Sequence, residues 1–385
     1  MALTVNTNVA SLTSQRNLGG SQELLKTSLE RLSTGLRINS AKDDAAGLAI
    51  SERFTSQIKG LDQGIRNAND GISLAQTAEG ALGEVTNNLQ RIRELAVQAS
   101  NATNTADDRT ALQNEVSALV SEIDRVAQQT TFNGTKLLDG GFTGAVFQIG
   151  ANAGDSITIN SISNSTAASL GTETTYTQSA TATISGATGF AVAIAAGTIE
   201  ISGNSTSVEL GAIAAAGSYQ ERAGQIVAAI NDTTGQTGVF AFITSGNAIV
   251  VQSQTGDFII SGATLANASI SGAASTTGTA TTGVSSLSVA TYGASQTAIS
   301  LIDDALSTIN TSRSTLGAVQ SRFESAVSSQ QTTSENLSAS RARIQDADFA
   351  AETANLAKAQ ILQQSGIAML AQANAIPQNV LALLQ

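Results

Sequence analysis

Both ends of the chain carry apolar residues at the spacing of an α-helix, with most steps of three, four or seven residues. At the amino-terminal end these residues are Val5, Val9, Leu12, Leu25, Leu29 and Leu32. At the carboxyl-terminal end they are Leu362, Met369, Ile376, Val380 and Leu383. Each end is therefore expected to form a helix with one narrow apolar stripe.

A second pair of periodic segments lies further inside the chain. From residue 54 to 96 the apolar positions alternate between steps of four and three residues, and one extra three-residue step joins Ala75 to Ala78. Such a step locally overwinds a coiled coil, and it is a candidate site for switching between two packings. The larger apolar members of this segment are Phe54, Ile58, Leu61, Ile65, Ile72, Leu82, Leu89 and Ile92. Its expected partner carries Leu306, Ile309, Leu316 and Phe323.

The middle of the chain has a different composition. Between Lys136 and Arg313 the only basic residue is Arg222, and Gly, Ser, Thr and Ala dominate. The stretches TIEIS and TSVEL alternate apolar and polar residues on either side of a turn, a short amphipathic helix follows, and two more strand-like stretches come after it. This order predicts a β-β-α-β-β insertion.

These patterns predict a mainly α fold, in which both chain ends form a long antiparallel helical coiled-coil core with a central α+β, β-rich insertion. The predicted domains are 1–44 with 345–385, then 45–174 with 289–344 as a helical bundle with a β-hairpin, and 175–288 as the insertion.

The composition excludes several classes of enzyme. The chain has no histidine and no cysteine, so it can hold neither a Ser/His/Asp triad, nor a cysteine nucleophile, nor a Cys/His metal cluster. Adjacent acids such as Asp107 and Asp108 are expected to cap or flank helices. We therefore predict a protein that is not an enzyme, without catalytic residues, cofactor or metal site.

Charge and hydropathy restrict the partners. The net charge is −11, which disfavours nucleic acid because binding needs clustered Lys and Arg to neutralise phosphates. No apolar run reaches the roughly 18 residues of a membrane span, so membrane insertion is not expected. The start of the chain lacks the basic and apolar regions of a cleaved signal peptide.

The apolar stripes at the two ends need to be covered. Two thin helices rich in Ala and Ser bury little surface together, so other copies of the chain are the expected cover. A heterologous contact that repeats without closing builds a helical polymer. We expect residues 1 to about 40 and 345–385 to become ordered only on assembly.

Two long motifs connect these ends with a known family. The stretches RLSTGLRINSAKDDAAGLAI, at 31–50, and ARIQDADFAAETANLAKAQILQQSGIAMLAQAN, at 342–374, closely resemble the two ends of bacterial flagellin. The resemblance covers about 1–140 and 293–385, whereas the central region looks like a hook-type insertion repeat.

The resemblance implies a structural subunit of the extracellular flagellar filament that serves motility. It also implies export through the flagellar type III apparatus with an export chaperone, which suits a chain without cysteine. A filament cap and hook-junction proteins would be further partners, and the monomer would be a ligand of a host Toll-like receptor.

The stretch QRIRELAVQ, at 90–98, is similar to the flagellin segment that this receptor recognises. By position, Arg91 and Leu95 match receptor-contacting residues on this helix, and Glu115 matches one on the next. Arg91 would supply a multi-donor fork and Leu95 an apolar anchor. A face that packs in the filament would be exposed in the monomer, so recognition is expected to be monomer-selective.

Two alternatives stay open at this point. One is a hook-filament junction protein from the same export system. The other is a secreted adhesin, in which the central insertion binds a ligand and the helices form a stalk. The insertion would be dispensable for polymerisation in a filament subunit and essential in an adhesin.

Overall fold

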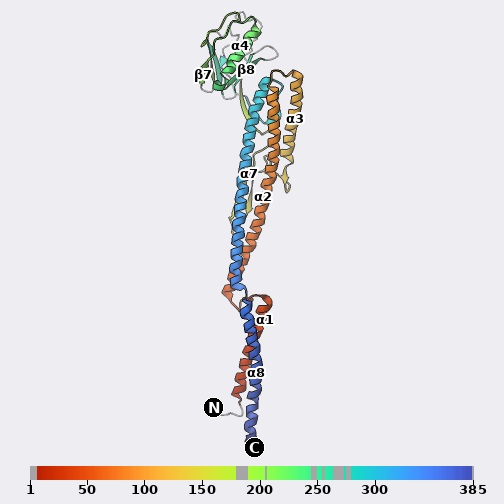
Figure 1. Ribbon diagram of the computed structural model, residues 1–385, viewed down its shortest axis with the longest axis vertical. Coiled ribbons are helices and arrows are strands. Elements are labelled where there is room, and N and C mark those ends of the chain that lie inside the picture. Colours follow the sequence, from red (N-terminus) through yellow and green to blue (C-terminus); the bar gives the residue numbers. More distant parts are fainter. Residues whose placement is uncertain are drawn as a thin grey trace. The chain divides into compact units, whose positions relative to one another are not determined.

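The computed structural model describes most of the chain as helices with a central group of small sheets (Figure 1). The described ranges are 7–178, 190–203, 206–243, 249–253, 256–262, 273–274 and 279–383, and within them the side chains of 173–178, 273–274, 279–281 and 376–383 are not described. The chain divides into two compact units. Unit 1 comprises 1–69, 147–157 and 323–385, and unit 2 comprises 70–146 and 158–322. The mainly α class predicted from the sequence is confirmed.

Unit 1 contains two antiparallel helix pairs. Helix α1 (Val9–Thr34) runs along α8 (Phe349–Leu383), so the two chain ends pack together as predicted (Figure 1). The second pair consists of the first part of α2 (Ala45–Ala99) and the last part of α7 (Tyr292–Gln345). Arg341 donates to Thr55 and Ser334 donates to Asp62, which shows that this second pair also runs antiparallel.

Local sequence sets both ends of α1. The Asn8 side chain caps the first turn by accepting from the Ser11 amide at 3.0 Å. Gly35 ends the helix in the left-handed conformation, with φ at 75°, and its amide donates to the Arg31 carbonyl. Glycine is favoured there because a Cβ would be strained at that φ.

Unit 2 packs the remaining parts of α2 and α7 with α3 (Ala106–Gln129). The expected cap of α3 was Asp107 or Asp108, but the structure places Thr105 at the N-cap. Thr105 and Asp108 bond each other's backbone amides in a capping box, which satisfies two amides that the first turn leaves without a partner. The Thr105 hydroxyl also donates to Asp108 Oδ2 at 2.7 Å, and this bond, followed by the bond from the Thr105 amide, lowers the pKa of Asp108 below its ordinary value.

Short strands follow α3. Strands β1 (Thr131–Phe132) and β2 (Thr135–Lys136) form a two-residue hairpin through Asn133 and Gly134, both with positive φ. Asn-Gly is the pair that such a turn prefers. Strands β3 (Gly144–Gln148) and β4 (Ser156–Asn160) form a second two-stranded sheet.

The predicted stripe of α2 and α7 lies largely in the core. The buried members are Ile58, Leu61, Leu82, Leu89, Ile92, Ile309, Leu316 and Phe323, and the half-buried members are Phe54, Ile65, Ile72 and Leu306. Ala75 and Ala78, on either side of the extra three-residue step, are both fully buried, and α2 continues through them without a break.

The insertion begins at β5 (Thr172–Gln178) and ends at β12 (Thr279–Thr282). One sheet has the order β11-β10-β6-β7 and the other the order β12-β5-β9-β8. Between the two ends lie β6 (Ile199–Gly203), β7 (Thr206–Glu209), α4 (Tyr219–Asp232), α5 (Thr234–Thr237), β8 (Val239–Ile243), β9 (Ile249–Ser253), β10 (Phe258–Gly262) and β11 (Ala273–Ala274). The expected β-β-α-β-β order is present as β6, β7, α4, β8 and β9, with further strands added.

The insertion has a hydrophobic core of its own, made by the inner faces of its strands and the apolar face of α4. Arg222 of α4 is buried in this region, with 1% of its surface exposed. Its Nη2 donates to the carbonyls of Phe190 and Val192, whereas its Nε and Nη1 have no partner among the described residues. Arg222 therefore holds the segment before β6 against α4 through backbone carbonyls alone.

Within the described ranges, none of the helices has a stretch long and apolar enough to span a membrane.

The self-contained core makes the stability of the insertion testable by one neighbouring pair of substitutions. Phe258 is fully buried, and Ile259 next to it is about half exposed. We expect Phe258→Ala to destabilise the insertion by about 3–5 kcal/mol because it leaves a cavity, and Ile259→Ala by less than about 1 kcal/mol. Hydrogen exchange of the amides in β6 and β8–β10 measures the difference. Equal effects of the two substitutions would contradict this core.

Candidate assembly surfaces on the terminal helices and on α2

Small side chains form the seam between α1 and α8. On α1 the buried residues are Ser11, Ser21 and Ser28, and on α8 Ala359 and Ala373 are buried. Gly366 faces Leu18 so closely that a Cβ on Gly366 would lie 3.8 Å from the Leu18 Cβ. Small residues let two helix backbones approach each other, and they bury little apolar surface in doing so.

Polar contacts set the register at the amino-terminal end of this seam. The Asn8 side chain donates from Nδ2 to the Ala373 carbonyl at 2.8 Å. One turn further, Ser11 Oγ donates to Asn374 Oδ1 at 2.8 Å. Both bonds need one particular offset between the helices, so they favour a single alignment of α1 on α8.

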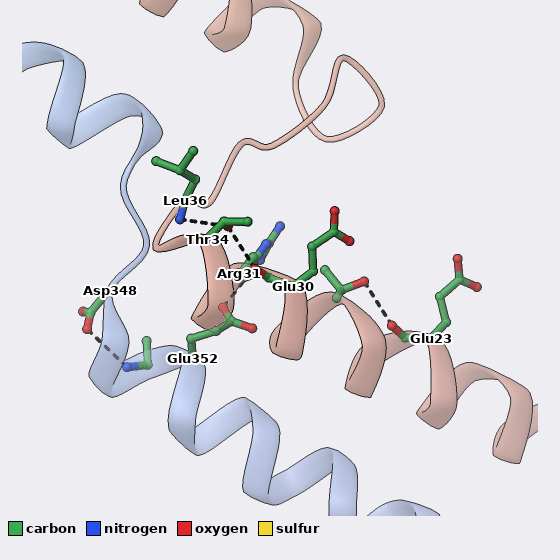
Figure 2. Close-up of polar contacts among 9 residues, drawn as sticks. Glu23, Glu30, Arg31, Thr34, Leu36, Asp348 and Glu352 are labelled. Carbon is green, nitrogen blue, oxygen red and sulfur yellow. Dashed lines mark hydrogen bonds and ion pairs between the residues drawn. The ribbon is translucent and has the colours of Figure 1, made fainter.

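An ion pair joins the two helices at the opposite end of the seam. Figure 2 shows Arg31 of α1 directed toward Glu352 in the first turn of α8, and the Nη1 to Oε2 distance is 3.6 Å. Glu352 is buried, so water screens this pair less than it screens an exposed pair. Asp348 accepts from the amides of Ala350 and Ala351 and so caps α8.

The connections α1–α2 and α7–α8 cross next to this ion pair. Leu36 and Asp346 form an antiparallel β-bridge. The Arg37 amide donates to the Gln345 carbonyl at 2.7 Å, and the Ala347 amide donates to the Gly35 carbonyl at 2.9 Å. The two turns are therefore held to each other by backbone hydrogen bonds.

The loop after this crossing, at 38–44, is held by its own side chains. Asp43 accepts hydrogen bonds from Ser40 and from the Asn39 amide, and these bonds lower the pKa of Asp43 below its ordinary value. Ile38 is buried, and a Cβ on Gly47 would meet both Ile38 and Asp44 within 3 Å. A larger residue at this position would displace the ends of these two side chains where α2 begins.

The structure leaves most of the described residues of the terminal stripe exposed. Leu25 and Leu32 are half-buried. The other described members are exposed, namely Val9, Leu12, Leu29, Leu362 and Met369. The buried residues of the seam named above are small, namely Ser on α1 and Ala on α8. Val5 lies outside the described residues, and the side chains of Ile376, Val380 and Leu383 are among those not described.

Further large apolar residues that the sequence pattern did not identify are exposed on the same helices. They are Leu24 on α1 and Phe349, Ile361 and Ile367 on α8, and each is more than half exposed. We call the exposed apolar residues of α1 and α8 the outer apolar faces. Their members are Val9, Leu12, Leu24, Leu29, Phe349, Ile361, Leu362, Ile367 and Met369.

A second candidate surface lies on α2 and α3 in unit 2. The Arg91 side chain is half exposed and bonds Glu94 on its own helix at 2.9 Å. It also bonds Glu115 on α3, from both Nε and Nη2 to Oε1 at 3.0 and 2.9 Å. The hydrogen bonds to Glu94 and Glu115 raise the pKa of Arg91 above its ordinary value. The structure thus brings together Arg91 and Glu115, two of the three expected contact residues.

Leu95 departs from the expected exposed anchor. Its side chain is 1% exposed and lies in the core beside Ile92 and Ala96. The periodicity of α2 contained this signal, because Leu95 is adjacent to the buried stripe and follows Ile92 by three residues. On the opposite side of the helix, Arg93 pairs with Asp303 of α7 at 2.7 Å and links the two long helices.

The α1–α8 seam can be tested by a disulfide. Because the chain has no cysteine and the Cβ separation of 18 and 366 fits a disulfide, the double substitution Leu18→Cys, Gly366→Cys is expected to form one intrachain bond on mild oxidation. Ser21→Leu should slow its formation because a large side chain separates the helices. Intact-mass measurement over time follows the reaction.

Ser33→Leu is the matched control, since Ser33 is exposed on the same helix. It should leave the rate of disulfide formation unchanged. Equal rates of disulfide formation in the Ser21→Leu and Ser33→Leu variants would contradict a seam packed from small side chains.

The two helical ends match two family models. Residues 5–143 match the bacterial flagellin N-terminal helical region, and residues 299–384 match the bacterial flagellin C-terminal helical region. Together these matches cover more than half of the chain.

Full-length relatives show the same similarity. The chain is 41% identical to B-type flagellin of Pseudomonas aeruginosa over an alignment of 491 residues, and 41% identical to Flagellin B of Vibrio cholerae over 388 residues. Both alignments cover all of each chain. Among solved structures, FliC from Burkholderia pseudomallei is 26% identical, with a TM-score of 0.40, and the match covers 66% of this chain and 99% of that one.

Proposed function

Because this chain belongs to the bacterial flagellin family, and is thus a structural subunit of the extracellular flagellar filament, we propose that its copies polymerise through the outer apolar faces of α1 and α8. The carrying observation is the division of side chains on these helices. The buried residues of the seam include Ser and Ala, whereas the nine large residues of the outer apolar faces are exposed.

This division has an energetic consequence. Burying one Leu, Ile or Met side chain that water now surrounds contributes about 1.5–3 kcal/mol. The nine residues of the outer apolar faces occur on both helices, so one α1–α8 pair can contact more than one neighbour. Contacts between unlike faces repeat without closing and give a helical polymer rather than a dimer.

Other partners follow from the same family membership. We assign the carboxyl-terminal end of α8 to the export chaperone and the type III export apparatus before assembly. The filament cap and the hook-junction proteins would meet the same terminal helices at the two ends of the polymer. The apolar character of the last residues supports both assignments.

Assembly is testable with substitutions that change the outer faces and leave the seam intact. The triple variant Leu12→Ser, Ile361→Ser, Met369→Gln should abolish seeded polymerisation, because assembly no longer gains the free energy of burying these three apolar side chains. Its circular dichroism should match the parent, since all three side chains are exposed in the single chain. Electron microscopy and light scattering after seeding provide the measurement.

Deletion of 175–288 is the companion variant. It removes the insertion as predicted from the sequence, which includes β6 to β12 and all but the first three residues of β5. It leaves α1 and α8 unchanged, so polymerisation should persist. Normal filaments from the triple variant, or none from the deletion, would be incompatible with assembly through these faces.

We also propose that the surface around Arg91 is the contact for a host Toll-like receptor. The support is positional similarity together with the geometry of Arg91, whose planar fork is held in place by Glu94 and Glu115. Leu95 does not reach the surface, but its buried side chain holds this turn of α2 against the core and so positions Arg91.

Arg91→Ala should raise the monomer concentration needed for half-maximal receptor activation roughly thirtyfold or more. This factor corresponds to a loss of about 2 kcal/mol in binding free energy, as expected of a central arginine. Its thermal unfolding should stay close to the parent's because the side chain is half exposed. Leu95→Ala should lower both activation and thermal stability, since it opens a cavity. A dose-response assay on receptor-expressing cells measures activation.

Arg125→Ala is the matched control. Arg125 makes a comparable exposed pair with Glu122 on α3, and its loss should not change activation. Filaments should activate less than the same mass of monomer. Full activation by the Arg91→Ala monomer would remove Arg91 from the contact.

A further inference from the structure

Strand β8 lies at the edge of the sheet β12-β5-β9-β8. Among the strands that the structure describes, it pairs with β9 alone, in the register Val239 with Ser253 through Ile243 with Ile249. In an antiparallel edge strand, the backbone groups of alternate residues face away from the partner strand. Such unpaired groups are a template for another chain, and proteins cover them in several ways.

One side chain satisfies both backbone groups of Ala241. The Ala241 amide donates to Asn231 Oδ1 at 2.8 Å, and Asn231 Nδ2 donates back to the Ala241 carbonyl at 3.0 Å. A residue on a neighbouring antiparallel strand would make the same reciprocal pair of bonds. The primary amide of Asn231 therefore occupies the place of a strand.

Two threonines do the same for Val239, two residues earlier. Thr234 Oγ1 donates to the Val239 carbonyl at 2.8 Å, and the Val239 amide donates to Thr237 Oγ1 at 3.2 Å. Val239 and Ala241 are two residues apart, so their backbone groups point to the same side of the strand. These four bonds therefore lie on one edge. We call Asn231, Thr234 and Thr237 the edge cap.

The edge cap comes from the short connection that leads into β8. Helix α4 ends at Asp232, α5 follows, and Gly238 reverses the chain with φ at 67°. Helix α4 packs against β8, which brings its last turn beside Ala241. Every cap residue therefore lies within ten residues of the backbone group that it satisfies.

The sequence of β8 favours pairing with β8 of a second copy. Its sequence, VFAFI, contains neither charge nor proline, and Ile243 at its end is exposed. Apolar β-forming segments without charge are typical of strands that associate edge to edge. Two copies of β8 can pair antiparallel about Ala241, which gives a twofold contact with identical strands.

We infer that the edge cap prevents β8 from pairing with β8 of a second copy. The insertion therefore does not join two chains through their β8 strands. The protected surface is distinct from the outer apolar faces of α1 and α8. It is therefore open to test in unseeded monomer, whether or not those faces build the polymer.

Asn231→Ala is the central variant, and Gln236→Ala is the control, because Gln236 is an exposed amide in the same connection. In dilute Asn231→Ala, the Ala241 amide should exchange hydrogen about tenfold faster than in the parent, the factor expected for loss of one hydrogen bond. At high concentration it should become protected again as chains associate. Sedimentation velocity of unseeded protein should show dimers in Asn231→Ala only.

A second variant separates strand pairing from loss of folding. Ile243→Lys, added to Asn231→Ala, places a charge at the end of the open edge. It should restore the monomer at high concentration, and the Ala241 amide should then stay fast-exchanging. Asn231→Ala that sediments as the parent does at high concentration would overturn the inference. So would association that Ile243→Lys fails to suppress, because it would come from unfolding rather than from β8.

Discussion

The close approach of α1 and α8 is the constraint on which the rest depends. Ser11, Ser21 and Ser28 of α1 and Ala359 and Ala373 of α8 are buried, and Gly366 of α8 lies directly against Leu18 of α1. The large residues of the outer apolar faces are exposed. Register comes from polar contacts at the two ends of the seam, with Asn8 at one end and the Arg31–Glu352 pair at the other. The register of α1 on α8 is thus well specified, whereas many large apolar side chains of the two helices stay exposed.

The insertion has the opposite character. Its strands and α4 enclose a core around Phe258 and Ile226, so its apolar residues are largely buried within one chain. Its outer strand β8 is closed by the chain's own side chains. The same polypeptide therefore exposes large apolar residues on α1 and α8 and satisfies the outer backbone groups of Val239 and Ala241 with its own side chains. Both features use short-range contacts that single residues control.

The surface around Arg91 combines two roles in one turn of α2. Leu95, Ile92 and Ala96 belong to the core, whereas Arg91 and Glu94 face outward and reach Glu115 on α3. A partner that binds Arg91 would contact a guanidinium already oriented by two carboxylates. Less side-chain freedom is then lost on binding than for a free arginine.

The sequence by itself determined the helices, the insertion and the absence of cysteine and histidine chemistry, because these follow from local periodicity and composition. It identified the apolar stripes but not what each stripe meets. Val9 and Met369 belong to these stripes, and both are exposed in the single chain, whereas the buried residues of the seam between α1 and α8 are smaller and come from positions far apart in the sequence. Thr105 rather than an aspartate caps α3 since capping depends on backbone conformation. The bonds of Asn231 to Ala241 exist only once Gly238 has reversed the chain, so tertiary structure alone decided that edge.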